Sequence, residues 1–167
     1  MPHPLVLALF DTPAQATAAA RALRELGVSH ERVSIVARSH GEEEALARAS
    51  GGSPGSEIED SSLASRLGEL GAHFLSAVAL VMPGIGPIVA DGPLATELAE
   101  AAGHAAGSIA RSLRKGGMDE ATSDEWEERI EAGAIAVGAH VASDGVTAAR
   151  DALSAAGAVR MAELAWE

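Results

Sequence analysis

The chain has 167 residues, of which 47% are hydrophobic and 2% aromatic, and its formal net charge is −12. The length suffices for one domain with a sizeable core, and the acidic excess repels phosphate backbones and anionic lipid headgroups, so we expect no nucleic-acid partner. Cysteine is absent, which excludes disulfides, thiolate metal sites and cysteine nucleophiles.

The first residues do not have the pattern of a targeting segment. Residues 1–12 lack a basic stretch, and Asp11 ends the first apolar run well short of a signal-peptide core or a membrane span. We therefore expect a cytoplasmic protein.

Residues 4–37 predict a strand, a helix and a second strand. An apolar run comes first, a stretch with apolar residues every three or four positions follows, and a second apolar run closes the unit, over residues 4–10, 14–26 and 33–37. Asp11 and Thr12 are candidate N-caps of the helix, and Pro13 suits its first turn. Gly27 is the expected helix end.

A long segment, residues 39–132, separates this unit from the next predicted strand. Residues 39–60 are acidic and then rich in glycine, serine and proline, which predicts a short helix followed by a linker. Two helices are expected after it, over residues 62–82 and 93–115, because apolar residues recur on one face of each. Two prolines and two glycines within residues 83–87 break the helical pattern. The segment therefore predicts a helical hairpin.

An uncharged apolar stretch, residues 74–90, raises the alternative of a membrane span. A span needs roughly 20 apolar residues in one element, and this stretch is broken near its middle by two prolines and two glycines. We therefore expect a buried hairpin and no membrane partner. A membrane-surface role of the apolar hairpin stays open as an alternative.

Residues 119–165 repeat the pattern of the first unit after a short acidic helix. The helix, a strand, a second helix and a last strand are expected over residues 119–131, 135–141, 146–156 and 159–165. Ser143 and Asp144 are the candidate N-caps of the second helix, and Gly157 is its expected end.

The two units share sequence at a constant offset of 130 residues. The match extends backwards through the apolar runs without a gap, and its identical positions are Thr17, Ala18, Ala19, Ala22, Leu23 and Gly27 against Thr147, Ala148, Ala149, Ala152, Leu153 and Gly157. Two strand–helix–strand units related by duplication most economically form an α+β fold, the ferredoxin-like split βαβ sandwich. We expect one sandwich from residues 1–38 and 133–167, with the linker and helical hairpin of residues 39–132 inserted between its second and third strands.

Three segments of the chain carry a resemblance to a known family. They read VLALFDTPAQATAAARALRELGV with VSIVAR, MPGIGPIVADGPLA between two helices rich in small residues, and EWEERIEAGAIAVGAHV. Together they resemble the small bacterial general stress proteins, also described as heat-induced stress proteins. The resemblance spans nearly the whole chain and implies a ferredoxin-like core, a Gly/Ala-rich helical insertion and a role in stress tolerance, with no catalytic residues. The insertion of this chain departs from the family at Glu69, His73, Glu97, Glu100 and His104.

Two Glu–His pairs in the expected hairpin are candidate metal ligands. Glu69 and His73, like Glu100 and His104, are four residues apart, so each pair shares a helical face. If the chain reverses around Pro87, both pairs lie at the same height of the hairpin, where two carboxylates and two imidazoles suit zinc or iron. The alternative is that both pairs are solvated and that no cofactor is bound.

No catalytic arrangement is recognisable in the sequence. It has no Ser/His/Asp set that the repeat would be expected to bring together, and residues 84–87 lack the lysine and hydroxyl of a phosphate loop. His140 falls at the place of Phe10 in the first unit, and we expect it to be packed and hydrogen-bonded. We therefore expect a non-enzymatic stress-response protein that acts through self-association, as a homo-oligomer, or through a protein partner. A regulatory module that binds a small ligand or a metal is the alternative, by fold analogy.

Overall fold

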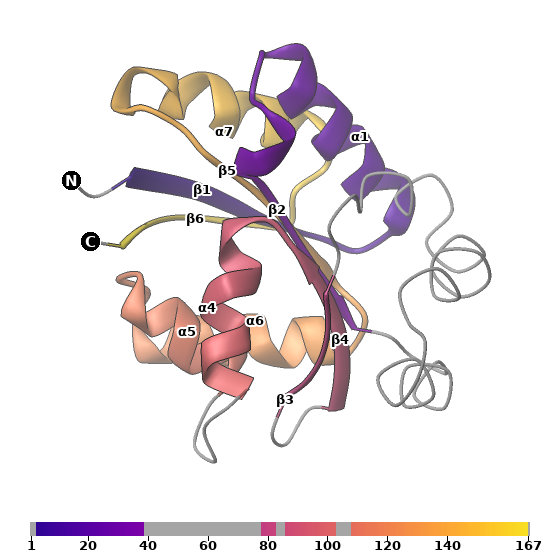
Figure 1. Ribbon diagram of the computed structural model, residues 1–167. Coiled ribbons are helices and arrows are strands. Elements are labelled where there is room, and N and C mark those ends of the chain that lie inside the picture. The colour runs from indigo at the N-terminus through magenta and orange to yellow at the C-terminus, as the bar shows by residue number, and fades with distance from the viewer. Residues whose placement is uncertain (1–2, 39–77, 83–85, 103–107, 167) are drawn as a thin grey trace.

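The computed structural model describes residues 3–38, 78–82, 86–102 and 108–166. In this part the chain forms a six-stranded antiparallel sheet with helices on both faces, which is an α+β fold (Figure 1). The strand order is β3-β4-β2-β5-β1-β6. The strands are β1 (His3–Phe10), β2 (Val33–Arg38), β3 (Val78–Met82), β4 (Gly86–Asp91), β5 (Ile135–His140) and β6 (Arg160–Trp166). The helices are α1 (Pro13–Glu25), α4 (Pro93–Ala102), α5 (Ile109–Lys115), α6 (Glu120–Glu131) and α7 (Val146–Ala155).

The first predicted unit, β1–α1–β2, is confirmed. Thr12 is the N-cap of α1, and its hydroxyl oxygen accepts a hydrogen bond from the backbone N–H of Gln15 at 3.2 Å. Pro13 occupies the first turn, where its missing N–H has no intrahelical partner to lose. Gly27 follows the helix with a φ of 90°, and this left-handed conformation ends the helix.

The second predicted unit, β5–α7–β6, is present, but its expected helix caps are wrong. Ser143 and Asp144 lie in a 3-10 turn, Ser143–Gly145, that leads directly into α7. The N-cap position is therefore Gly145, where no side chain makes a cap hydrogen bond. Gly157, with a φ of 104°, follows the end of the helix as expected.

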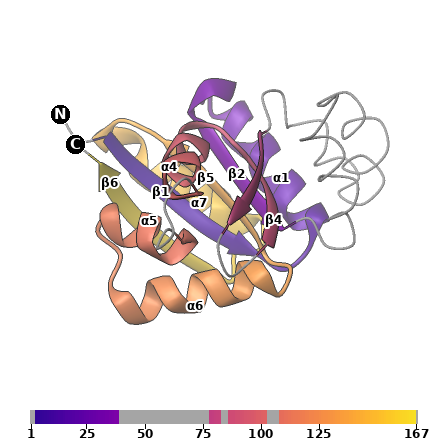
Figure 2. The same ribbon diagram turned by 60° about the horizontal axis from the view of Figure 1, so that its bottom comes forward.

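Helices α1 and α7 cover one face of the strands of both units (Figures 1 and 2). Those strands lie side by side in the order β2-β5-β1-β6. The helices are rich in alanine, which lets them pack close to the sheet. We call the buried residues between these two helices and the sheet the first core. They are Val6, Ala8, Phe10, Ala16, Ala19, Ala20, Leu23, Val33, Ile35, Ala37, Ile135, Val137, Ala139, Ala149 and Leu153.

The first strands of the two units, β1 and β5, do not follow the 130-residue offset of the helices. Leu23 of α1 corresponds at this offset to Leu153 of α7, and both are buried in the first core. Leu5 would correspond to Ile135, yet these two side chains lie on opposite faces of the sheet. Because successive strand residues alternate between faces, the strand offset differs from the helix offset by an odd number of residues. The expected gap-free match backwards through the first strand of each unit is therefore wrong.

The expected helical hairpin is wrong where the structure describes it. Residues 78–82, predicted as the end of a helix, form β3, which pairs antiparallel with β4 so that Val78 lies opposite Ala90. Five successive apolar residues fit a strand as well as a buried helix, and β-branched valines favour the strand. Since β4 also pairs with β2, the two strands extend the sheet. The acidic segment and the rest of the predicted helix, within residues 39–77, lie outside the described residues.

The expected helix over residues 93–115 begins where predicted but is not one element. Helix α4 starts at Pro93, and α5 starts at Ile109 after an extended residue, Ser108. The hydroxyl oxygen of Ser108 accepts from the backbone N–H of Arg111 at 3.0 Å, which is the geometry of a new helix start.

Two contacts fix the start of α4 against β2. Gly92 has a φ of 84°, and a Cβ at this position would overlap the carbonyl oxygen of Val33. The close approach of residue 92 to β2 therefore requires glycine. The hydroxyl oxygen of Ser34 accepts from the backbone N–H of Leu94 at 3.0 Å. Strand β2 therefore positions the first helix of the second layer.

Helices α4, α5 and α6 cover the second face of the sheet (Figure 2). They pack on the strand residues that alternate with those of the first core, such as Leu7 and Leu9. Trp126 of α6 is among the largest fully buried side chains. Burial of this apolar surface stabilises the second layer. Among the helices that the structure describes, none is long and apolar enough to cross a bilayer.

Candidate functional site

A groove opens at one end of the α1/α7 layer. It lies between residues 26–32, which connect α1 to β2, and residues 141–145, which lead from β5 to α7. Its volume is about 420 Å³, a size typical of small-molecule sites. The lining residues are Leu26, Gly27, Val28, Ser29, Arg32, His140, Val141, Ala142, Gly145, Ala148 and Ala149.

The lining is mainly apolar. Leu26 is 49% exposed and, with Met161, is one of the two exposed large hydrophobic residues in the described part of the chain. Ser29, Arg32 and His140 are the polar lining residues, and no carboxylate lines the groove although the chain has 24 acidic residues. Apolar walls with a few polar groups are typical of ligand sites.

Arg32 is the charged residue of the groove. Its backbone N–H donates to the carbonyl oxygen of Ser29 at 2.9 Å, at the 3-10 turn His30–Arg32. Its guanidinium has no ion pair among the described residues, whereas Arg150 pairs with Glu163 at 3.0 Å. Arg32 is exposed, and its guanidinium is therefore available to a ligand.

The corresponding place in the other unit is filled by a side chain. At the helix offset of 130 residues, the groove residues Gly27 and Gly145 correspond to Gly157 and Gln15. The side chain of Gln15 packs against Gly157, with its Nε2 2.9 Å from the point that a Cβ of residue 157 would occupy. Its Oε1 is buried and has no hydrogen-bond partner in the described structure. One unit thus carries glutamine where the other leaves space beside glycine.

The two helix-to-strand connections also differ in length. The connection beside the groove has seven residues, 26–32, and its counterpart between α7 and β6 has four, 156–159. The longer connection includes the 3-10 turn that carries Arg32. The longer connection and Gly145 are both departures from the repeat, and they are the sequence signal by which this groove could have been found.

His140 lies at the end of β5 and is not equivalent to Phe10. Phe10 is fully buried in the first core, and Ala139 and Val141 pack on the same side of the sheet. Alternation along the strand therefore directs the His140 imidazole toward the opposite face, so we do not count the imidazole among the polar groups of the groove. The residue as a whole is half-buried, with its Nε2 buried.

One of the four candidate metal ligands lies in the described part of the chain. A carboxylate oxygen of Glu100 is 3.6 Å from Nζ of Lys115, and one of Glu97 is 3.2 Å from the same atom. The hydrogen bond to Glu97 is the main cause that raises the pKa of Lys115. Within the described ranges no group of three His, Asp or Glu side chains could hold a metal ion. The other three candidates lie outside these ranges: Glu69, His73 and His104.

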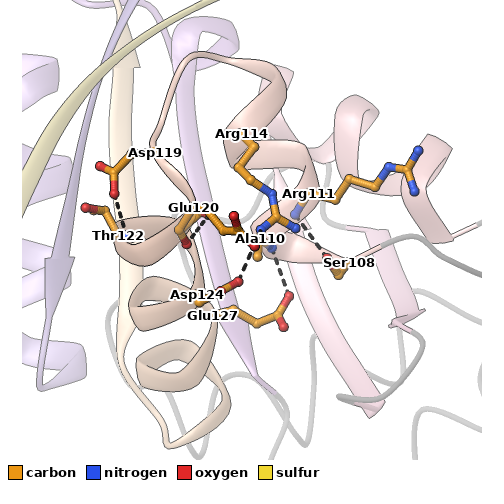
Figure 3. A network of polar contacts seen from close by, with 10 residues as sticks. Ser108, Ala110, Arg111, Arg114, Asp119, Glu120, Thr122, Asp124 and Glu127 are labelled. Carbon is orange, nitrogen blue, oxygen red and sulfur yellow. Dashed lines mark hydrogen bonds and ion pairs between the residues drawn. The ribbon is translucent and has the colours of Figure 1, made fainter.

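A polar network between α5 and α6 has a structural role (Figure 3). A carboxylate oxygen of Asp119 accepts from the backbone N–H of Thr122 at 3.0 Å and caps α6. The hydrogen bonds from Thr122 hold the pKa of the Asp119 carboxyl below its ordinary value. An oxygen of Glu127 accepts from the backbone N–H of Ala110 at 2.8 Å, at the start of α5. Asp119 therefore stabilises the start of α6, and Glu127 links α6 to the start of α5.

Comparisons of the chain with protein-family models, with curated proteins and with solved structures found no match. The groove and the resemblance of the three segments are therefore the grounds on which a function can be proposed.

Proposed function

We propose that this protein is a non-enzymatic regulatory module that binds a small molecule in the groove at the end of the α1/α7 layer. One observation carries the proposal: the groove stays open beside Gly145, whereas Gln15 fills the corresponding place in the other unit. Exposed apolar surface such as that of Leu26 is unfavourable in water. A ligand in the groove would cover this surface as Gln15 covers its counterpart.

The architecture that we propose is ferredoxin-like. The order β2-β5-β1-β6, with α1 and α7 on one face, supports a duplicated strand–helix–strand unit made of residues 1–38 and 133–167. Residues 39–132 would then be an insertion that adds β3 and β4 to the sheet and α4–α6 to its second face. Fold analogy alone does not identify the ligand.

The biological setting that we propose is a bacterial stress response. This part rests on the resemblance of the three segments and is independent of the groove. Binding of a small molecule would then regulate self-association or the binding of a protein partner, without catalysis.

A fragment screen by two-dimensional NMR tests the binding function. A library of neutral, cationic and anionic fragments is added to the ¹⁵N-labelled full chain, and the shifted amides are mapped. We expect some fragments to shift the amides of Val28, Val141 and Ala148 and to leave those of the α5–α6 network unchanged. If no fragment of any charge shifts the groove amides, the proposed function is wrong.

A further inference from the structure

We infer that the groove takes a small monocarboxylic acid with an apolar body, held by the guanidinium of Arg32. The inference rests on the proposed binding function and deepens it, because it names the class of ligand and the residue that selects it.

The charge of the groove is opposite to that of the chain. The formal net charge of the chain is −12, yet the lining residues of the groove include one arginine, Arg32, and no Asp or Glu. A guanidinium presents a planar fork of donors that matches a carboxylate in a bidentate arrangement. The start of α7 also lies at the groove and has no side-chain cap, so the positive end of its dipole adds to the charge of Arg32.

A single negative charge fits this site better than a phosphate group does. Arg32 is the single cation among the lining residues, and a dianion would leave one charge uncompensated within an acidic protein. We therefore assign the ligand a carboxylate.

The rest of the lining selects an apolar body. Leu26, Val28 and Val141 form apolar walls together with two alanines of α7, and a volume of about 420 Å³ holds a short alkyl or aryl group beside the carboxylate. Burial of that group would supply affinity, while Arg32 would supply the preference for an anion.

Titrations of hexanoate, 1-hexanol, hexylammonium and acetate into the full chain, followed by NMR, test this inference. The first three probes each have six carbon atoms in an unbranched chain and differ in charge, and acetate keeps the carboxylate without the long chain. We expect hexanoate to shift the groove amides with at least about tenfold higher affinity than each of the other three. Against 1-hexanol and hexylammonium the difference is that expected for one charge-assisted hydrogen-bonded pair, and against acetate it comes from burial of the alkyl chain.

Two variants separate the role of Arg32 from a general charge effect. Arg32→Gln should lower the affinity for hexanoate about tenfold and leave that for 1-hexanol unchanged. Arg24→Gln removes the same charge from an exposed position of α1 that does not line the groove, and it should leave both affinities unchanged.

Equal affinity for hexanoate and 1-hexanol would overturn the inference, and so would an Arg32→Gln variant that binds hexanoate as the wild type does. Inorganic phosphate, titrated in the same way, would overturn it by binding as tightly as hexanoate. The inference is also wrong if none of the probes shifts the groove amides. The proposed binding function is also wrong only if no fragment of the library shifts the groove amides.

Discussion

Three glycines of the chain are required for different structural reasons. A Cβ on Gly138, in a central strand, would lie 2.7 Å from Cδ1 of Leu7. Gly92 combines a left-handed backbone with an overlap against Val33, whereas Gly27 is left-handed with open space around its Cβ direction. The glycines therefore differ in whether packing, backbone conformation or both require them.

Alanine at each of these glycines should destabilise the protein to a different degree. We expect a loss of about 1 kcal/mol for Gly27→Ala from the left-handed backbone alone, and about 1–3 kcal/mol for Gly138→Ala from overpacking. Gly92→Ala should cost more than either, because both effects act there. Urea unfolding of the three variants measures the order, and a Gly27→Ala variant as unstable as the other two would contradict it.

At the scale of elements, the outer units were predictable because their signals are local. Thr12, Pro13 and Gly27 mark the ends of α1 through short-range hydrogen bonds and backbone preferences. The caps of α7 were missed because a 3-10 turn precedes that helix. The strand at residues 78–82 was missed because its pairing with β4 is a tertiary contact that helical periodicity does not report.

The groove was missed for a related reason. It forms where two connections meet that are more than 100 residues apart in the chain. In addition, the repeat was identified from identical residues, and a difference such as Gln15 against Gly145 does not contribute to that match. The burial faces of β1 and β5 were misjudged because a one-residue slip between strands leaves no trace in an unbroken apolar run.

Two hydroxyl caps should differ in their contribution to stability. Ser34→Ala leaves the buried N–H of Leu94 without its acceptor, which should cost about 1–3 kcal/mol. Thr12→Ala removes an exposed cap and should cost about 1 kcal/mol. Chemical denaturation compares the two, and an equal or smaller loss for Ser34→Ala would show that β2 does not position α4 through this bond.

The link between α6 and β6 should weaken in acid. Glu125 is 3.2 Å from Arg160 and 3.3 Å from Arg129, and the hydrogen bond to Arg160 is the main cause that lowers the pKa of Glu125. Since the pKa is lower in the folded state, the stabilisation is present above the ordinary value of 4.5 and is lost as the pH falls through the folded value.

Unfolding free energies of the wild type and Glu125→Gln measured against pH check this link. We expect the wild type to be the more stable at neutral pH and the difference to disappear on acidification. A difference that stays constant down to strongly acidic pH would contradict the role of the carboxylate.

At the scale of the whole molecule, self-association stays a prediction. The apolar hairpin that motivated it is replaced by β3 and β4 where the structure describes the segment. Light scattering on the full chain at micromolar concentration measures the mass. A dimer or larger species is expected, and a monomer whose mass is unchanged by salt would contradict self-association.

The role of the open groove can be tested by placing a glutamine at position 145, because Gln15 fills the corresponding place in the first unit. Gly145 has a φ of −95° and a ψ of −6°, which any residue adopts, and a Cβ there would lie 3.4 Å from Cβ of Val141, a groove residue. Gly145→Gln therefore places at the groove the side chain that Gln15 provides in the first unit. Gly145→Ala is the matched control, since it adds the Cβ alone.

The affinity of groove-binding fragments for these two variants, measured by NMR titration, tests the central claim most directly. We predict that Gly145→Gln folds as the wild type does and binds the fragments at least about tenfold more weakly, whereas Gly145→Ala stays within about twofold of the wild type. Fragments that bind Gly145→Gln as tightly as the wild type would show that the groove beside Gly145 is not the binding site.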